Sequence, residues 1–282
     1  MKPLKRLNYK MIDYHVHPGY SLDATGSILE YCERAKEIGL KEICFTPHLE
    51  LDPVRDEKIE IRSKIVPARS DWLDIYFEDL DVAIREFPEL EIKKGIEIGY
   101  APEIEQKIAN ITSKYPFDFV LGAIHSINHI AISNGEEAAK YYKGKSPAEV
   151  CREYFALLEA VIESNLFDCI AHFDVYKKYG VKYYGRDLIL EAEPLIEPML
   201  RLVRNNGILI EINTSGLRKE INEIFPSPHI LKRLHELGCN SITIGSDAHT
   251  VADLGKGIKE ASILAKDLGF NIVRFEKRVP AK

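Results

Sequence analysis

Several histidines and carboxylates in this chain are spaced so that their side chains would share one face of a strand. In the run Asp13–His17, alternate side chains point the same way, so His15 and His17 can bind one metal ion with Asp13 one step behind. The run Asp247–His249 repeats the spacing with a carboxylate and an imidazole. Taken alone, each motif is also compatible with chance or a hydrogen-bonded core pair.

A carboxylate inside an apolar run points to the same chemistry. Glu97 lies in the run Gly95–Gly99, where an unpaired charge would cost several kcal/mol. A buried Lys or Arg would be one explanation, and a metal ion is the simpler one. His48 and His172 are each, in isolation, typical of structural histidines. Six of the nine histidines nevertheless follow apolar runs, and this joint placement predicts a polynuclear metal site: His15, His17, His48, His125, His172 and His249.

The elements that must position these residues can be read from the hydrophobic pattern. Short apolar runs predict seven strands: Met11–Val16, Glu42–Thr46, Ile92–Ile98, Phe119–Ile124, Cys169–Ala171, Ile208–Ile212 and Ile242–Gly245. Helical periodicity is clear over Ser27–Ile38, Glu149–Ser164, Arg186–Asn205 and His229–Leu237. This alternation predicts parallel βα units closed into a barrel, whose active sites lie at the carboxyl ends of the strands.

Length and charge narrow the class of protein. A chain of 282 residues can form one such barrel, and we expect a single domain over residues 1–282. Two polar segments, near 51–70 and 126–146, are predicted to be loop insertions that act as lids or are disordered. The net charge of −6 argues against a nucleic-acid partner, because such proteins present a basic surface.

The sequence also suggests a cellular location. No apolar stretch reaches the ~18 residues of a membrane span, and residues 1–6 do not lead into an apolar signal segment. The five cysteines are scattered and form no CxxC pair, which is typical of reduced thiols. We expect a cytoplasmic protein without a membrane partner, and the sequence leaves its oligomeric state open.

Taken together, these motifs resemble the polymerase-and-histidinol-phosphatase (PHP) superfamily over essentially the whole chain. The resemblance rests on HxH near the start, Asp23 six positions after the second histidine, and the later motifs in order. It implies a distorted seven-stranded TIM-like (β/α) barrel with three divalent metal ions at the carboxyl ends of its strands. The implied ligand sets are His15, His17, Glu97 and Asp247; Glu97, His125 and His172; and Asp23, His48 and His249.

Such a centre would hydrolyse phosphate esters. Two close metals sharing a carboxylate can lower the pKa of a bridging water to about 7, and the resulting hydroxide would attack phosphorus. We expect Glu97, Asp247 and His249 to be the catalytic members of the ligand set. Mixed imidazole and carboxylate ligation suits zinc, iron or manganese. Three divalent ions would outweigh three carboxylates, so a small phosphomonoester dianion fits the site.

Residues outside the ligand set are predicted from position and resemblance. Arg218, Lys178 and Lys177 are candidates to bind the substrate phosphate, with a solvated surface charge as the alternative. Asp13 is expected to hold His15 in its metal-binding tautomer, and Asn213 and Ser215 to orient ligands or substrate.

Within the superfamily, the runs Tyr20–Asp23 and Glu211–Arg218 are most similar to monofunctional histidinol-phosphate phosphatases. This implies hydrolysis of L-histidinol phosphate in histidine biosynthesis. One alternative is a related phosphoesterase acting on nucleotides or nucleic-acid ends. Another is a metal-binding protein without catalytic activity.

Overall fold

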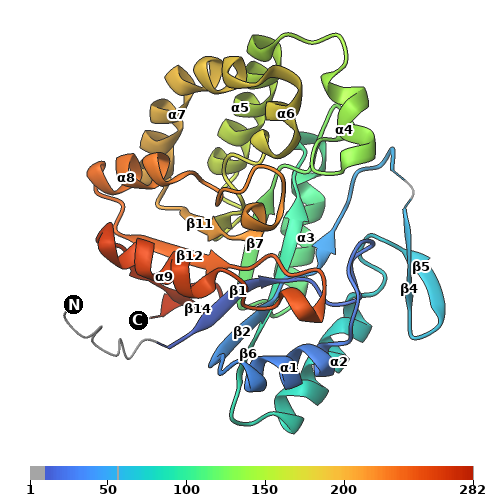
Figure 1. Ribbon diagram of the computed structural model, residues 1–282. Helices are drawn as coiled ribbons and strands as arrows, with labels where there is room; N and C mark the ends of the chain where they lie inside the picture. Colours follow the sequence, from blue (N-terminus) through green and yellow to red (C-terminus); the bar gives the residue numbers. More distant parts are fainter. Residues whose placement is uncertain (1–9, 56, 282) are drawn as a thin grey trace.

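A curled parallel sheet surrounded by helices forms the body of the computed structural model, which describes residues 10–55 and 57–281 (Figure 1). The strands of this sheet are β1 (Ile12–Val16), β2 (Glu42–Phe45), β3 (His48–Leu49), β6 (Glu91–Gly99), β7 (Phe119–Ala123), β10 (Cys169–Ile170), β11 (Leu209–Asn213), β12 (Ser241–Gly245) and β13 (Asn271–Ile272). The α-helices are α1 (Ile28–Glu37), α2 (Leu73–Glu86), α3 (Glu105–Lys114), α4 (Gly135–Tyr142), α5 (Pro147–Glu163), α6 (Lys177–Tyr184), α7 (Arg186–Asn206), α8 (Pro228–Glu236) and α9 (Ile258–Asp267). Short 3-10 helices cover Pro102–Ile104, Ser215–Arg218 and Val251–Asp253.

The order of the strands carries the sheet around into a barrel-like curl. Along the sheet the order is β1-β2-β6-β7-β10-β11-β12-β13, with β3 also paired to β6. The end of β12 comes back to β1, where the amide of His17 donates to the carbonyl of Ala248 at 2.9 Å and the amide of Asp247 donates to His15 at 2.8 Å. These contacts bring the first and last histidine motifs together.

All seven predicted strands are confirmed, as β1, β2, β6, β7, β10, β11 and β12. The four predicted helices are also confirmed, as α1, α5, α7 and α8. Local sequence explains two of the helix starts, because Ser27 and Ser146 each form a capping box with the glutamate three residues on. The helices α2, α3, α4, α6 and α9 were not predicted, and neither were the short strands β3 and β13 or the terminal hairpin of Arg274–Glu276 and Val279–Ala281.

The expectation that residues 51–70 and 126–146 are plain loops is wrong. The first segment contains the hairpin β4 (Lys58–Ile61) and β5 (Lys64–Pro67), and the second contains the hairpin β8 (Ser126–Ile127) and β9 (Ile130–Ala131), followed by α4. In β4 the burial alternates, with Ile59 and Ile61 facing inward. Two buried isoleucines among charged residues gave too weak a pattern to identify the strand.

The two inserted segments are fastened to each other. The guanidinium of Arg55 donates to both carboxylate oxygens of Glu137, at 2.6 and 3.0 Å, and its neighbour Asp52 contacts Nδ1 of His129 at 2.9 Å. Arg55 also donates to Glu57. We refer to the Arg55–Glu137 and Asp52–His129 contacts as the clasp.

The amino-terminal end of the curled sheet is closed by the hairpin β14 (Arg274–Glu276) and β15 (Val279–Ala281). Phe275 is 2% exposed and packs with Tyr14 and Phe119 in the cluster inside the sheet. Within the described part of the chain, helices are too short or too polar to cross a membrane. Residues 1–6, on which the predicted location partly rests, lie outside the described residues.

Candidate metal centre

The predicted metal ligands gather around the buried side chain of Glu97 at the carboxyl end of the sheet. Its oxygen Oε2 lies 3.3 Å from Nε2 of His15, 3.5 Å from Nε2 of His17 and 2.7 Å from Nδ1 of His48. Its oxygen Oε1 lies 3.3 Å from Nε2 of His125 and 3.0 Å from Nε2 of His172. The two carboxylate oxygens therefore face different sets of imidazoles.

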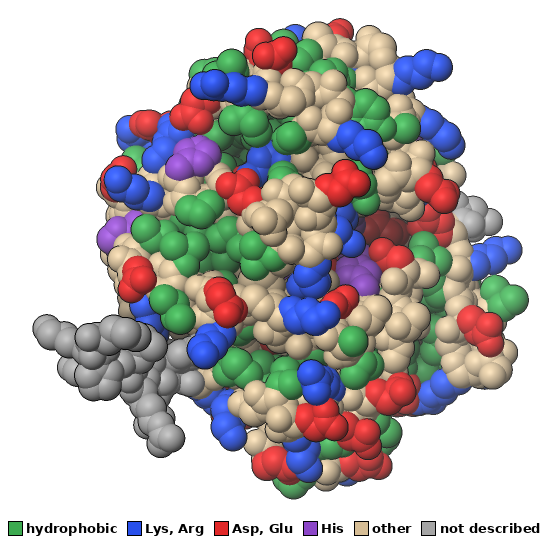
Figure 2. Space-filling view, in the orientation of Figure 1, with side chains coloured by type: hydrophobic (Ala, Val, Ile, Leu, Met, Phe, Trp, Pro, Cys, Tyr) green, Lys and Arg blue, Asp and Glu red, His purple; other side chains and the backbone are tan. Residues whose placement is uncertain are grey.

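The remaining predicted ligands lie beside these residues, but the groups that the distances form agree only in part with the sets implied by the resemblance, so the division among three ions stays a prediction. Oδ1 of Asp247 lies 3.3 Å from Nε2 of His17, and Nε2 of His249 lies 3.4 Å from Oδ1 of Asp23 and 3.2 Å from Nε2 of His48. Sets of side chains whose ligand atoms could share one ion include His15, His17 and Asp247; His48, Glu97 and His125; and His17, His48 and His249. The surface is hollowed where histidine, acidic and basic side chains meet (Figure 2).

The charges in this cluster are set by mutual contact. Burial would raise the pKa of Glu97, but the imidazoles of His15, His125 and His48 outweigh burial and hold that pKa well below its usual range. Burial, together with His48 and His249, holds the pKa of His17 well below its usual range. Burial would lower the pKa of His15 and His125, but the carboxylates around them outweigh burial and raise the pKa of His15 well above its usual range and that of His125 to about 10. Glu97 and His17 are thus in the protonation states that metal ions bind, whereas His15 and His125 would release protons when a metal binds.

Unused hydrogen-bonding atoms show that the residues fit a metal centre. Several buried atoms of the cluster lack a hydrogen-bond partner among the described residues, including His15 Nε2, His17 Nε2, His48 Nδ1 and Glu97 Oε2. The last two atoms lie 2.7 Å apart, but their orientation is not that of a hydrogen bond. Buried polar atoms without partners are costly, and ligation would satisfy them. These donors are nitrogen and oxygen, as zinc, iron and manganese prefer.

The prediction for Asp13 is wrong in its contact. The pairing register of β1 against β2 shifts between Asp13 and Val16, which breaks the simple alternation of faces assumed from the sequence. The carboxylate of Asp13 accepts from the backbone amides of Ser246 at 2.8 Å and Gly255 at 3.2 Å, not from the His15 ring. It holds the segment that carries Asp247.

Three other side chains hold the outer nitrogens of the ligand histidines. Oε1 of Glu211 lies 2.7 Å from Nδ1 of His15, and Oε1 of Glu50 lies 2.7 Å from Nδ1 of His125. The hydroxyl of Ser21 lies 3.2 Å from Nδ1 of His17. Sequence reasoning missed all three, although Glu211 gave the same signal as Glu97, a carboxylate within an apolar strand.

The other predicted polar residues lie close to Asp247. The Asn213 amide donates to Oδ2 of Asp247 at 3.2 Å, and its oxygen accepts from the hydroxyl of Ser215 at 2.6 Å. Ser215 also lines the cavity over the cluster. These contacts suit the orienting roles predicted for both residues.

The predicted phosphate-binding residues divide into two kinds. Lys178 lines the cavity, as does Lys219, which was not predicted. Lys177 and Arg218 are not among its lining residues, and their contact with the phosphate stays a prediction. Lys177 is 4% exposed and pairs with Asp174 at 2.6 Å and Glu223 at 2.7 Å.

Arg218 supports the backbone of the ligand loop, and its Nη1 is buried without a hydrogen-bond partner among the described residues. Its Nη2 donates to the carbonyls of Ser246 at 2.7 Å and Asp247 at 3.1 Å. Asp247 has a positive φ of 54°, a conformation that costs free energy in a residue other than glycine. Arg218 and Asp13 therefore both hold this strained turn: Arg218 donates to its carbonyls, and Asp13 accepts from its Ser246 amide.

Two adjoining cavities open over the cluster. The first, of about 250 Å³, is lined by ligands and by Lys178 and Lys219. The second, of about 120 Å³, shares Asp23, His48 and His125 with it and extends under the inserted hairpins. We call them the phosphate lobe and the side lobe.

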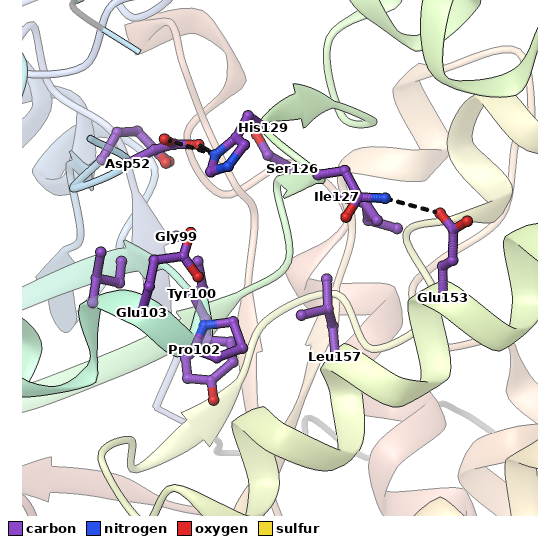
Figure 3. A pocket seen from close by; sticks show the side chains of 14 residues that line it. Asp52, Gly99, Tyr100, Pro102, Glu103, Ser126, Ile127, His129, Glu153 and Leu157 are labelled. Carbon is purple, nitrogen blue, oxygen red and sulfur yellow. Dashed lines mark hydrogen bonds and ion pairs between the residues drawn. The ribbon is translucent and has the colours of Figure 1, made fainter. Parts of the chain in front are cut away.

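A third cavity lies behind the side lobe. It has a volume of about 340 Å³ and is lined by Asp52, His129 and Glu153 among others, with no predicted metal ligand (Figure 3). Glu50 borders both this cavity and the side lobe. The carboxylate of Glu50 therefore separates the third cavity from His125.

This fold and this cluster define a class, the TIM-like barrels with metal-binding histidines and carboxylates at the carboxyl ends of their strands. The chain belongs to the PHP domain family, which matches residues 13–215.

Known proteins similar over nearly the full length support the assignment. The chain is 30% identical to a probable histidinol-phosphatase of Clostridium acetobutylicum, over 95% of this chain and 98% of that protein. It is 28% identical to a probable histidinol-phosphatase of Deinococcus radiodurans, over 95% of this chain and 97% of that protein. A crystal structure of histidinol phosphate phosphatase from Lactococcus lactis, in complex with zinc, L-histidinol and phosphate, matches with a TM-score of 0.80 and 26% identity. That match covers 97% of this chain and 99% of the other.

Proposed function

We propose that this protein is a histidinol-phosphate phosphatase that hydrolyses L-histidinol phosphate to L-histidinol and phosphate in histidine biosynthesis. The observation that carries the proposal is a histidine and carboxylate cluster beneath a cavity that is basic on one side and acidic on the other. Full-length similarity to histidinol-phosphatases supports the same reaction. We further propose that residues 1–282 form one domain.

The proposed cofactors are three divalent ions of zinc, iron or manganese, held by the nine ligands predicted above. When bound, such ions activate water and polarise the phosphoryl group. Zinc accompanies the Lactococcus lactis structure, which supports zinc first. Glu50 and Glu211 add carboxylates beside the ligands, so the net charge of the metal-loaded centre would be less positive than the ions and the nine ligands alone give.

The protein's own groups bind and orient the phosphate. Lys178 and Lys219 reach the phosphate lobe, where ammonium groups would pair with the non-bridging oxygens. Burial lowers the pKa of Lys178, although the nearby Asp247 carboxylate opposes this effect. Glu97, Asp247 and His249 form the catalytic core in this proposal, with Asn213 fixing the direction of the Asp247 carboxylate.

The side lobe favours a cationic organic group. Its lining includes the carboxylates of Asp23, Glu50 and Glu57, aliphatic side chains such as Ile59, and the guanidinium of Arg55, which is paired with Glu57 and Glu137. An amine and an imidazole suit such a lining, whereas the anionic backbone of a nucleic acid does not. The side lobe thus supports histidinol phosphate over the alternative substrate class.

A phosphate-release panel tests the proposal. The metal-loaded protein is assayed with histidinol phosphate, nucleoside monophosphates and single-stranded DNA, and its metal content is measured on the same sample. We expect histidinol phosphate to give the highest kcat/KM. Faster release from a nucleotide or from DNA would contradict the proposal, and bound metal without any turnover would favour a non-catalytic metal-binding protein.

A further inference from the structure

Glu211 is a buried carboxylate without a lysine or arginine partner among the described residues. It lies on β11, is 1% exposed, and forms no ion pair with a lysine or arginine among residues 10–55 and 57–281. Its one ion-pair contact there is the ring of His15. An uncompensated buried charge of this kind is strongly destabilising, so a compensating positive charge or a set of strong donors is expected.

The donors around Glu211 come from three strands or strand ends. Oε1 contacts Nδ1 of His15 at 2.7 Å. Oε2 accepts from the backbone amide of His172 at 3.1 Å and from the side-chain amide of Asn213 at 3.1 Å. Both oxygens are thus occupied by groups that belong to the metal centre or orient it.

The contact with His15 selects a tautomer. A carboxylate accepts the proton of Nδ1–H, which leaves the lone pair on Nε2. Nε2 of His15 is buried without a hydrogen-bond partner among the described residues and lies 3.3 Å from Glu97 and 3.7 Å from Asp247. The nitrogen left free by Glu211 is the one that faces the other ligands.

The contact with His172 fixes a strained backbone. His172 has a positive φ of 29°, which is sterically unfavourable for a residue with a Cβ atom. Its amide is held by Glu211 while its Nε2 lies 3.0 Å from Oε1 of Glu97. One carboxylate therefore positions a ligand on each side of Glu97.

The neighbouring strand leaves room for this arrangement. A Cβ atom on Gly245 of β12 would lie 2.2 Å from Oε1 of Glu211 and 2.2 Å from Cβ of His15. Glycine at this position allows the two side chains to meet.

We propose that Glu211 is a positioning residue of the metal centre, which sets the metal-binding tautomer of His15 and holds the backbone of His172. The inference rests on the metal centre of the proposed function but not on the identity of the substrate. It assigns no metal–ligand bond to Glu211 itself.

The test compares Glu211→Gln with Glu42→Gln. Glu42 is also a fully buried glutamate of the sheet, but it lies at the opposite end and pairs with Lys10 and Arg274. Zinc affinity is measured by competition with a chromophoric chelator, without substrate. We expect Glu211→Gln to weaken zinc binding by about 10–100-fold, because one amide oxygen cannot serve donors on both sides. Glu42→Gln should bind zinc as the wild type does.

Turnover separates positioning from a general loss of structure. At saturating zinc, Glu211→Gln should lower kcat for histidinol phosphate with little change in KM. Equal zinc affinity in wild type, Glu211→Gln and Glu42→Gln would overturn the inference. If zinc binding depends on Glu211 but histidinol phosphate is not hydrolysed, the proposed function fails and this inference stands.

Two further measurements apply if Glu211→Gln does not fold. Gly245→Ala keeps the carboxylate but crowds both it and the Cβ of His15, so that their contact is disturbed, and it should weaken zinc binding in the same direction; unchanged affinity would count against the inference. A crystal structure of the zinc-loaded wild type should show zinc on Nε2 of His15 and Glu211 on Nδ1. Zinc bound directly to Glu211, or to Nδ1 of His15, would overturn it.

Discussion

The two ends of the curled sheet both bury charged side chains, but they differ in what they leave unpaired. At the amino-terminal end, Glu42 pairs with Lys10 and Arg274, and the hydroxyl of Tyr14 donates to Glu42 and accepts from the amide of Phe275. At the carboxyl end, buried imidazole nitrogens and a carboxylate oxygen lack hydrogen-bond partners among the described residues.

This difference distinguishes the end of the barrel whose charged groups stabilise the fold from the end whose groups can bind a ligand. Where the buried charged groups are paired, as around Glu42, their contacts stabilise the fold and leave no atom free to bind a ligand. Where buried atoms lack partners, as at the carboxyl end, the metal-free protein loses stability but keeps atoms that can bind a ligand. Buried glutamates alone, such as Glu42 and Glu97, would not reveal which end does the chemistry.

Substitutions at the carboxyl end of the sheet, where buried atoms lack partners, should have the largest effect on activity. We expect Glu97→Gln to lower kcat by about 10³-fold, as the loss of a central electrostatic group does, and to reduce the metal content. Phosphate release and elemental analysis measure both effects, with Glu42→Gln as the control at the amino-terminal end. A fully active Glu97→Gln would refute the role given to this carboxylate.

Substitutions at the amino-terminal end of the sheet, where the charged groups are paired, should affect stability instead. Phe275→Ala removes a buried ring that packs against Phe119 with their centroids 4.7 Å apart. We expect the free energy of unfolding to fall by about 3–5 kcal/mol, as measured by urea unfolding of the metal-loaded protein. The kcat of the folded, metal-loaded fraction should not change; a large fall in it would show that the two ends are coupled.

Two adjacent lysines repeat the comparison on a smaller scale. Lys177→Met leaves the buried carboxylate of Asp174 without its partner and should cost about 3–5 kcal/mol of stability. Lys178→Met should leave stability nearly unchanged and raise KM by about 10–100-fold, the equivalent of one charged hydrogen bond. Paired unfolding and kinetic measurements check both effects, and an exchange of the two phenotypes would contradict the assignment.

The smallest expected effect concerns the clasp over the side lobe. Arg55→Ala removes the contact with Glu137, and we expect KM for histidinol phosphate to rise by about 5-fold, since such pairs contribute about 1 kcal/mol. Arg34→Ala, which removes the exposed pair with Glu37, is the control. If both variants had the wild-type KM, the clasp would have no part in shaping the side lobe.

The sequence was sufficient for the strands and for the convergence of the ligands. Strand ends marked by His48, His125 and His172 need only the barrel topology to bring them together, and hydrophobic runs predict that topology well. The chemistry of the centre could be inferred because it depends on which residue types stand at the strand ends, and not on their exact side-chain contacts.

Contacts that depend on register or side-chain direction could not be inferred. Asp13 was expected at the His15 ring, but its carboxylate accepts from the backbone amides of His15, Ser246 and Gly255. Adjacent Lys177 and Lys178 look alike in sequence, yet one faces buried acids and the other the cavity. Such distinctions are set by packing across elements far apart in the chain.

The spread of the ligands along the chain has a consequence for how the enzyme matures. His15 and His249 lie near opposite ends of the sequence, yet both belong to one cluster, in which His15 lies beside His17 and His249 lies beside Asp247. During synthesis on the ribosome, more than two hundred residues must be added after the first histidine motif before Asp247 and His249 are made. The complete set of predicted ligands is therefore present only after β12 has been synthesised, and a chain whose synthesis stops before β12 offers only a partial set.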